Sequence, residues 1–308
     1  MKNATPRISP VFVIVIGIFA VSTASIFIRF AQEYTSSLTI AAYRLTISTM
    51  VLAPFAWARY RTDIKSLTHR EWWLGGIAGV FLALHFATWI TSLEYTSVTS
   101  SVVLVTTMPL WVALLAPFAL KEPLQRPVVV GLGFALLGGI IVGIGDSCAW
   151  VDGRAVCTGA DAFFRGETFL GNFLALVGAW TAAGYFLIGR NLRAKLALIP
   201  YITLVYGIAA LVMIAIVIGF GAPVFGFPPL AYLWLLLLAL IPQLLGHSSF
   251  NWALGYLPAA FVSITMLGEP IGSIILAYFL LAERPSVLNL LGAGFILFGI
   301  YLASRKQK

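Results

Sequence analysis

Charged residues are scarce in this chain. Asp, Glu, Lys and Arg make up 10% of its 308 residues and apolar residues make up 60%, whereas a soluble domain has about 25% charged and about 45–50% apolar residues. The mean hydropathy is +0.98. A soluble protein of this length could not bury the roughly ten apolar stretches of about 20 residues that the sequence contains. The shortage of charge therefore excludes a soluble protein and predicts one that crosses the membrane many times.

Several chemical motifs are also missing. The sequence has no HExxH motif, no Walker phosphate loop and no nucleophile elbow in its usual setting. The glycine-rich stretch "GLGFALLGG" lacks the strand and the exposed turn that a nucleotide site requires. No basic stripe with interleaved aromatic residues is present, which argues against nucleic-acid binding. We therefore expect no cofactor and no nucleic-acid partner.

Cysteine occurs only twice, at Cys148 and Cys157. Both lie in the longest connection between apolar stretches, 147–168. In an oxidising compartment they could form a disulfide, or they could be two free thiols, because pairing cannot be deduced from sequence alone. A metal site is not expected, since no third Cys or His ligand lies near them.

The apolar stretches predict an all-α membrane protein with ten transmembrane helices. A helix of about 20 residues crosses a bilayer. The stretches of this length are 11–30, 38–58, 72–92, 97–119, 127–146, 169–189, 198–219, 231–253, 258–281 and 286–303. Their connections are short except for 147–168, so no soluble domain is expected outside the membrane.

The basic residues predict the orientation of the chain. With the N-terminus inside the cell, the inner segments hold fourteen Lys and Arg residues and the outer segments hold four, with Arg44 inside a span. Lys and Arg are retained on the cytoplasmic side of a membrane. We therefore expect an integral protein of the bacterial cytoplasmic (inner) membrane with both termini in the cytoplasm. The net charge of +8 reflects the same asymmetry.

The sequence repeats itself at an offset of 161 residues, without a gap. The matched pairs include charged, proline and aromatic residues: Pro109 with Pro270, Glu122 with Glu283, Arg29 with Arg190, Trp73 with Trp234, and Tyr95 with Tyr256. We predict a first five-helix repeat at 1–146, an external loop at 147–168 and a second five-helix repeat at 169–308. Because five is odd, the second repeat enters the membrane with the opposite orientation. Inverted repeats of this kind are typical of secondary transporters.

Two long segments carry a resemblance to a known family. They are "YTSVTSSVVLVTTMPLWVALLAPFALKEPL" and "YLPAAFVSITMLGEPIGSIILAYFLLAERP", and the first two spans add "IFIRFAQ" and "AAYRLTIS". Over nearly the whole chain, the sequence resembles the EamA-type transporters of the drug/metabolite transporter superfamily. The resemblance implies ten helices, an inverted repeat and movement of small organic solutes, commonly outward. It implies no single substrate, because such proteins carry amino acids, nucleosides, sugars and drugs.

A carboxylate stands in the middle of the ninth predicted span, where Glu269 directly precedes Pro270. Charge at this depth costs about 2.5–3.5 kcal/mol, so an ionisable residue there is a candidate for function. Proline breaks the helix, and freed backbone groups are tolerated only beside protein or a water-filled cavity. Pro109 lies at the same depth in the first repeat. Glu269 could bind a proton or a cationic group of the substrate, or it could cap free backbone donors at the break.

Two histidines lie within predicted spans, His85 in the third and His247 in the eighth, at an offset of 162 rather than 161. Gln243, His247 and Asn251 recur every four residues, which places them on one face of an α-helix, and His85 shares a face with Trp89. These faces predict a hydrated pathway that binds substrate. The alternative is interhelical hydrogen bonding that only holds the bundle together.

Three further residues complete the candidate site. Trp180 and Tyr185 lie midway along the sixth span, where they could form an aromatic wall for apolar solutes or simply pack. Arg44 lies six residues into the second span. It could neutralise a substrate carboxylate, but snorkelling to the outer interface or a structural ion pair is favoured.

These patterns predict a secondary active transporter, not an enzyme, that exports amino-acid-like, nucleoside-like or drug-like solutes by alternating access. Protons would be coupled through Glu269, and the other expected partners are membrane lipids. Multiply anionic substrates are not expected, because only Arg44 could pair with their oxyanions. Two alternatives stay open. One is an exporter of lipophilic cations, and the other is a membrane-embedded enzyme that acts on lipids or isoprenoids with His85 or His247 as its base.

Overall fold

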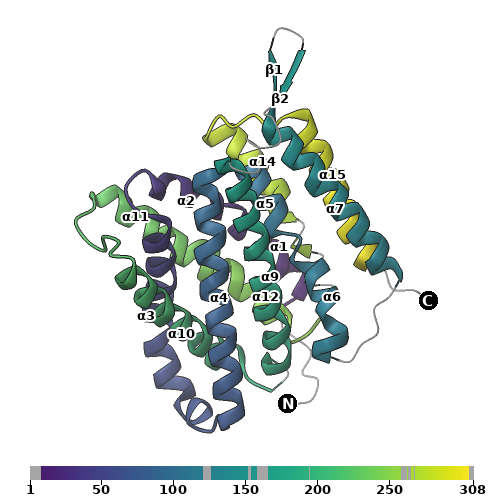
Figure 1. Cartoon of the computed structure of the whole chain (residues 1–308). Helices are drawn as coiled ribbons and strands as arrows, with labels where there is room; N and C mark the ends of the chain where they lie inside the picture. Colours follow the sequence, from purple (N-terminus) through teal and green to yellow (C-terminus); the bar gives the residue numbers. More distant parts are fainter. Residues whose placement is uncertain are drawn as a thin grey trace.

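The computed structural model describes residues 8–304 except 121–125, 152–153, 158–165, 194, 258–261, 263–264 and 267. The described part of the chain is a bundle of helices with one β-hairpin, so the predicted helical fold is confirmed (Figure 1). Its elements are α1 (Pro10–Ser22), α2 (Ala24–Gln32), α3 (Ser37–Lys65), α4 (His69–Tyr95), α5 (Val98–Val105), α6 (Met108–Leu120), α7 (Arg126–Ser147), β1 (Cys148–Val151), β2 (Arg154–Cys157), α9 (Glu167–Arg193), α10 (Leu198–Gly219), α11 (Pro229–Leu238), the π-helix η1 (Ala239–His247), α12 (Ser248–Ala253), α14 (Gly268–Leu280) and α15 (Val287–Ser304).

Six helical segments within the described residues are long and apolar enough to cross a membrane. They are Pro10–Gln32, Ser37–Lys65, His69–Tyr95, Glu167–Arg193, Leu198–Gly219 and Pro229–Ala253. Shorter apolar helices cover Val98–Val112, Val129–Val142, Gly268–Leu280 and Val287–Leu302. Together with the composition, these segments make the chain an integral membrane protein.

Prolines stand where two of the shorter helices begin. Helix α6 begins at Met108, so Pro109 falls in its first turn, and Pro270 falls in the first turn of α14, which begins at Gly268. Proline is tolerated in a first turn, because the missing N–H has no partner there in any helix. Between α5 and α6, the hydroxyls of two threonines donate to carbonyl groups of α5. The helix is therefore interrupted inside the bundle rather than at its surface.

The η1 segment is a π-helix with Pro242 inside it. In an α-helix the proline ring would clash with the carbonyl four residues earlier, and one hydrogen bond would be lost. The wider i→i+5 spacing of a π-helix relieves this conflict, and such turns are frequent at functional sites. The side chains that follow η1 therefore point in directions different from those that the same residues would have in an uninterrupted α-helix.

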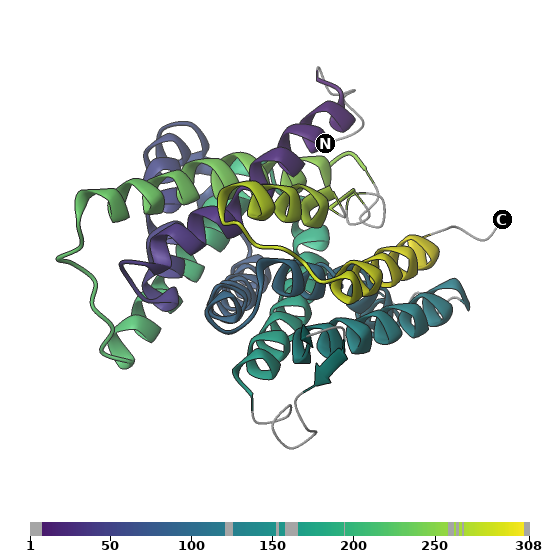
Figure 2. The same ribbon diagram turned by 90° about the horizontal axis from the view of Figure 1, so that it is seen from above.

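Helices from the two halves of the chain pack in pairs. Helix α4 lies along α9, α3 along α10, and α7 along α15, and the last pair runs side by side in both views (Figures 1 and 2). Glycines bring α7 and α15 together. A Cβ atom added at Gly138 would lie 2.6 Å from the carbonyl oxygen of Gly292, and one added at Gly299 would lie 2.5 Å from that of Gly131. Close backbone approach through small residues is typical of membrane helices.

This contact gives a first prediction. Gly138→Ala forces the α7 and α15 backbones apart, and overpacking of this kind costs about 1–3 kcal/mol. We expect a lower midpoint of thermal unfolding for the purified protein in detergent. Gly133→Ala on the same helix is the matched control, because nothing lies within 4 Å of its added Cβ. Equal midpoints for the two variants would contradict the prediction.

Two hydrogen bonds recur at the offset found in the sequence. Gln32 Nε2 donates to the carbonyl oxygen of Ile90 at 3.0 Å, and Arg193 Nε donates to the carbonyl oxygen of Asn251 at 3.0 Å. Both members of the second pair lie 161 positions after their counterparts. In each half, the end of the first helical stretch is therefore bound in the same way to the third helical stretch of that half.

An ion pair closes one end of the bundle. Arg29 Nη2 lies 3.2 Å from Glu283 Oε1 and also donates to the carbonyl oxygen of Thr96 at 3.2 Å. The other carboxylate oxygen of Glu283 accepts the N–H of Val98 at 3.0 Å, at the start of α5. Ala282, just before Glu283, has a φ of 54°, a strained value for a residue other than glycine. We call these contacts the Arg29–Glu283 clamp. It joins α2, the start of α5 and the connection after α14.

The β-hairpin extends from the end of α7, at the top of Figure 1, whereas the N-terminus lies at the bottom. Its antiparallel register places Cys148 directly opposite Cys157. The backbone thus brings the two cysteines to facing positions, as a disulfide requires. The disulfide itself stays a prediction.

Candidate functional site

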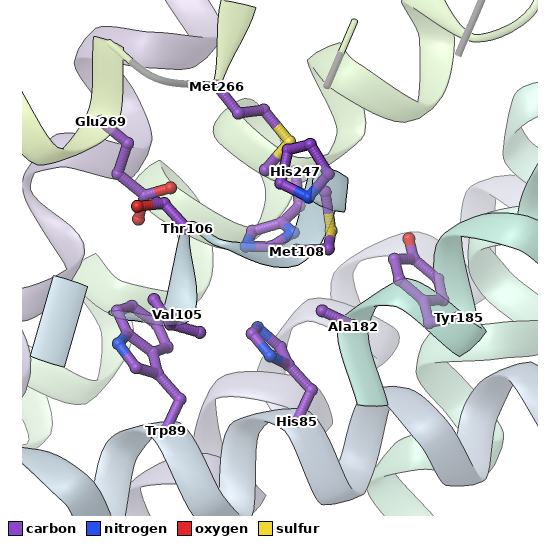
Figure 3. A pocket seen from close by; sticks show the side chains of 11 residues that line it. His85, Trp89, Val105, Thr106, Met108, Ala182, Tyr185, His247, Met266 and Glu269 are labelled. Carbon is purple, nitrogen blue, oxygen red and sulfur yellow. The ribbon is translucent and has the colours of Figure 1, made fainter. Parts of the chain in front are cut away.

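A small cavity lies inside the bundle, between the α5–α6 break and the start of α14 (Figure 3). The space that the centre of a water molecule can reach measures about 50 Å³, whereas a single water needs about 10–15 Å³. The cavity is lined by His85, Trp89, Val105, Thr106, Met108, Pro109, Ala182, Tyr185, His247, Met266 and Glu269. In this conformation it can hold a few water molecules, and it must widen to hold a metabolite.

Glu269 brings a carboxylate to the cavity. It lies in the first turn of α14 and is 8% exposed, and Figure 3 shows its carboxylate on the same side of the cavity as Thr106. The positive end of the helix dipole favours a negative charge at this position. Within the described part of the chain, no group donates a hydrogen bond to this carboxylate, so the predicted capping role finds no support there. The carboxylate is available to a proton or a ligand.

The two histidines meet at this cavity. Their ring centres lie 6.5 Å apart, and His85 stacks on Trp89 at 5.8 Å. Nδ1 of His85 lies 2.9 Å from the carbonyl oxygen of Gly178. A carbonyl can only accept, so Nδ1 carries the proton and Nε2 of the neutral ring is the acceptor. The predicted pair of histidines is therefore one local cluster.

Arg44 is completely buried, so the prediction that it snorkels to the outer interface is wrong. Its Nε donates to Gln243 Oε1 at 2.7 Å, and its guanidinium carbon lies 4.0 Å from the centre of the Phe86 ring. The buried face of α3, which also carries Ile40 and Ser48, turns Arg44 inward. Nη1 and Nη2 have no hydrogen-bond partner, and the predicted structural ion pair is not found among the described residues. An unpaired buried donor costs about 1–3 kcal/mol, and more when it is charged.

Gln243 and Asn251 do not line the cavity, although the four-residue spacing predicts that they share a face with His247. For Gln243 that spacing fails because Ala239–His247 is a π-helix, whereas Asn251 lies beyond it in α12 and is held by hydrogen bonds. Gln243 instead holds Arg44. Asn251 accepts the hydroxyl of Tyr185 at 2.9 Å and donates to the carbonyl oxygen of His247 at 2.9 Å. Both amides hold neighbouring side chains or backbone, and neither lines this cavity.

The structure separates the two aromatic residues of the sixth predicted span. Tyr185 is 5% exposed and lines the cavity. Trp180 is 39% exposed, packs edge-on against Trp111 and Phe173, and does not line this cavity. Five residues of α-helix turn the chain through about 140° beyond one full turn, so the two side chains cannot share a face.

Several lining residues are missing from the sequence prediction. Ala182 lies three positions before Tyr185, and this helical spacing could have identified it. Thr106 and Met266 stand close to the helix breaks, where the proline positions were the available signal. Phe86 packs on Arg44, but nothing in the sequence distinguishes it from the other apolar residues of its helix. Positions beside a break are hard to assign because helical periodicity ends there.

The chain is thus an integral membrane protein whose helices enclose a cavity with one carboxylate and two imidazoles, next to the first turns of two half-length helices. Discontinuous helices around a central site are typical of secondary transporters. The chain belongs to the EamA-like transporter family, which matches residues 8–144 and again residues 169–305. The resemblance stated from the sequence is thereby confirmed, and small-molecule transport in a lipid membrane follows from family membership.

Relatives of similar length carry transporter names without a substrate. An uncharacterized transporter of Archaeoglobus fulgidus is 24% identical over 286 residues, which cover 92% of this chain and 92% of that protein. The uncharacterized transporter YdfC of Bacillus subtilis is 23% identical over 95% of this chain and 89% of its own length. A shorter match, to a WAT1-related protein of Arabidopsis thaliana, is 31% identical over 107 residues, which cover 33% of this chain and 29% of that protein.

A solved crystal structure has a similar fold. It covers 97% of this chain and 98% of its own, with a TM-score of 0.68 and 16% sequence identity. At this identity the similarity concerns the fold alone.

Proposed function

We propose that this protein is a secondary active exporter that moves small organic metabolites across the bacterial cytoplasmic membrane by alternating access. The observation that carries this proposal is the carboxylate of Glu269 in an interior cavity between two half-length helices. A cavity inside the helix bundle, next to two broken helices, suits a solute that is bound midway and released to either side. The solute classes that fit are amino-acid-like, nucleoside-like and drug-like molecules.

The proposed architecture has ten spans in two inverted five-helix repeats, at 1–146 and 169–308, with 147–168 outside the cell. The recurrence of hydrogen bonds at the 161-residue offset supports two equivalent halves. The hairpin and the N-terminus lie at opposite ends of the bundle (Figure 1), which supports an external loop and cytoplasmic termini. Glu269 is proposed as the proton-coupling group.

A second candidate is export of lipophilic cations. Its support is the combination of the Glu269 carboxylate with the aromatic rings of Trp89 and Tyr185 in one cavity, because aromatic faces and carboxylates both attract cations. The two candidates differ in the transported solute, which is a lipophilic cation in one and a small organic metabolite in the other. Catalysis is not proposed.

The function is tested with proteoliposomes that contain the purified protein and a mixed metabolite extract. Mass spectrometry then measures which solutes are lost under an imposed pH gradient. Selective loss of one chemical class, absent from empty liposomes, supports export. Chemical alteration of a solute by the protein in detergent would favour an enzyme instead.

The histidines give a prediction for the solute so identified. His85→Ala and His247→Ala remove polar groups from the cavity wall, and we expect the apparent affinity to fall about tenfold, the effect of losing ~1.4 kcal/mol. The amount of folded protein is expected to change little. His69→Ala is the control, because His69 is exposed at the start of α4. Loss of folded protein without a change in affinity would indicate packing roles.

A further inference from the structure

Four buried N–H donors next to the cavity lack an acceptor. Nη1 and Nη2 of Arg44, Nε2 of Gln243 and Nε1 of Trp89 have no hydrogen-bond partner in the described part of the chain. Arg44 and Gln243 are 0% exposed, and Trp89 is 2% exposed. Buried polar groups are nearly always paired. Because every unpaired group in this cluster is a nitrogen donor, the complementary partner is an acceptor.

The cluster is held in a fixed place. Arg44 Nε is bound to Gln243 Oε1 at 2.7 Å, and the guanidinium carbon lies 4.0 Å from the Phe86 ring centre and 5.9 Å from that of Trp89. Trp89 lines the cavity, and the Phe86 ring centre lies 5.4 Å from that of His247. The guanidinium therefore lies directly behind the aromatic wall of the cavity, within reach of a solute once that wall shifts.

The chemistry of the donors selects the acceptor. The two terminal nitrogens of a guanidinium form a planar fork that matches the two oxygens of a carboxylate. One guanidinium balances one negative charge, and the other donors of the cluster are neutral. We propose that Arg44, Gln243 and Trp89 form a subsite that binds the carboxylate of a transported monocarboxylate solute. This proposal rests on the transport function proposed above and names its substrate class.

Charge balance restricts the rest of the solute. Glu269 also lines the cavity, and among the described residues it makes no ion pair with Arg44. A solute with a carboxylate at the Arg44 end therefore meets a second carboxylate elsewhere in the cavity. A neutral or cationic group there is compatible with Glu269, whereas a second carboxylate is repelled. Dicarboxylates are excluded on this basis.

The test uses matched carboxylates and amides as probes. Butanoate, hexanoate, benzoate and 4-aminobutanoate are each compared with the corresponding primary amide, by calorimetric titration of the full chain in lipid nanodiscs. We expect at least one acid to bind about tenfold or more tightly than its amide, the factor for ~1.4 kcal/mol. Arg44→Gln should remove this preference. Arg44→Lys, which keeps the charge without the fork, should retain part of it.

Gln243→Glu is a second variant that tests the subsite even if Arg44→Gln does not fold. The substitution changes only one amide to a carboxylate and supplies Arg44 with an internal anion, so we expect a higher midpoint of thermal unfolding and no preference for acids. Acid preference that persists in Gln243→Glu or Arg44→Gln would overturn the proposal. Equal weakening of acids and amides by Arg44→Gln would also overturn it, because it would indicate a purely structural arginine.

The two experiments test the carboxylate subsite and the transport function separately. Acid preference that depends on Arg44, without movement of any solute in proteoliposomes, would support the subsite and contradict the transport function. Transport of a solute without a carboxylate, unaffected by Arg44→Gln, would support the transport function and overturn the subsite.

Discussion

Glu269→Gln is expected to abolish solute movement driven by a pH gradient. The glutamine keeps the size of the side chain but cannot release or bind a proton in the way a carboxylate does. The Glu269 carboxylate lines the cavity and accepts no hydrogen bond from the described residues, so the substitution breaks none of these bonds. Exchange of solute between the two sides without a gradient should persist. The measurement is loss of the identified solute from proteoliposomes, with and without an imposed pH gradient.

Two matched variants make this result interpretable. Glu33→Gln makes the same change at an exposed position near the end of α2, and it should leave pH-driven movement unchanged. Glu269→Asp keeps the carboxylate on a shorter side chain and should retain coupling with weaker solute binding. If Glu269→Gln transports with an unaltered pH dependence, Glu269 is not the coupling group.

Charge reversal at the Arg29–Glu283 clamp is expected to have the second large effect. Arg29→Glu or Glu283→Arg places two like charges at the end of the bundle where α2, α5 and the connection after α14 meet. Repulsion there should open that end, and a shift of only ~1.4 kcal/mol between conformations changes their ratio about tenfold. We expect the initial rate of solute exchange to fall about tenfold for each reversal. The measurement is exchange of labelled solute across proteoliposomes.

The double reversal Arg29→Glu/Glu283→Arg distinguishes a gate from simple destabilisation. It restores the ion pair but not the bond from Val98 N–H to Glu283, so exchange should recover in part. The midpoint of thermal unfolding serves as the control, because both side chains are partly exposed and a pair of this kind contributes about 0–1 kcal/mol to stability. No recovery in the double variant would mean that charge pairing between α2 and the connection after α14 does not control the exchange rate.

Sequence reasoning identified the features that depend on composition and chemical type. A carboxylate beside a proline in an apolar span is expensive, so Glu269 and Pro270 stood out, and the structure places Glu269 on the cavity. The helices followed from the length of the apolar stretches. His85 and His247 were noticed because ionisable groups are rare within spans.

The direction in which a side chain points, and how deeply it is buried, were harder to predict. Hydropathy could not show that Arg44 is buried, because a long side chain near the end of a span can also reach the interface. Trp180 and Tyr185 were grouped by depth, although five residues of helix turn them apart. In an apolar helix the faces towards lipid and towards protein have the same composition, so periodicity carries little information.

The π-helix η1 changes how the duplication can be interpreted. In the repeat, the counterpart of His247 is Phe86, and the counterpart of His85 is Gly246. The two histidines therefore occupy adjacent rather than equivalent positions of the repeat. The wide turns before His247 rotate that helix by less per residue than an α-helix, so that the position after the counterpart of His85 meets His85 across the cavity. The scaffold is duplicated, but the histidine pair is not, and its near symmetry arises from a local change in helix winding.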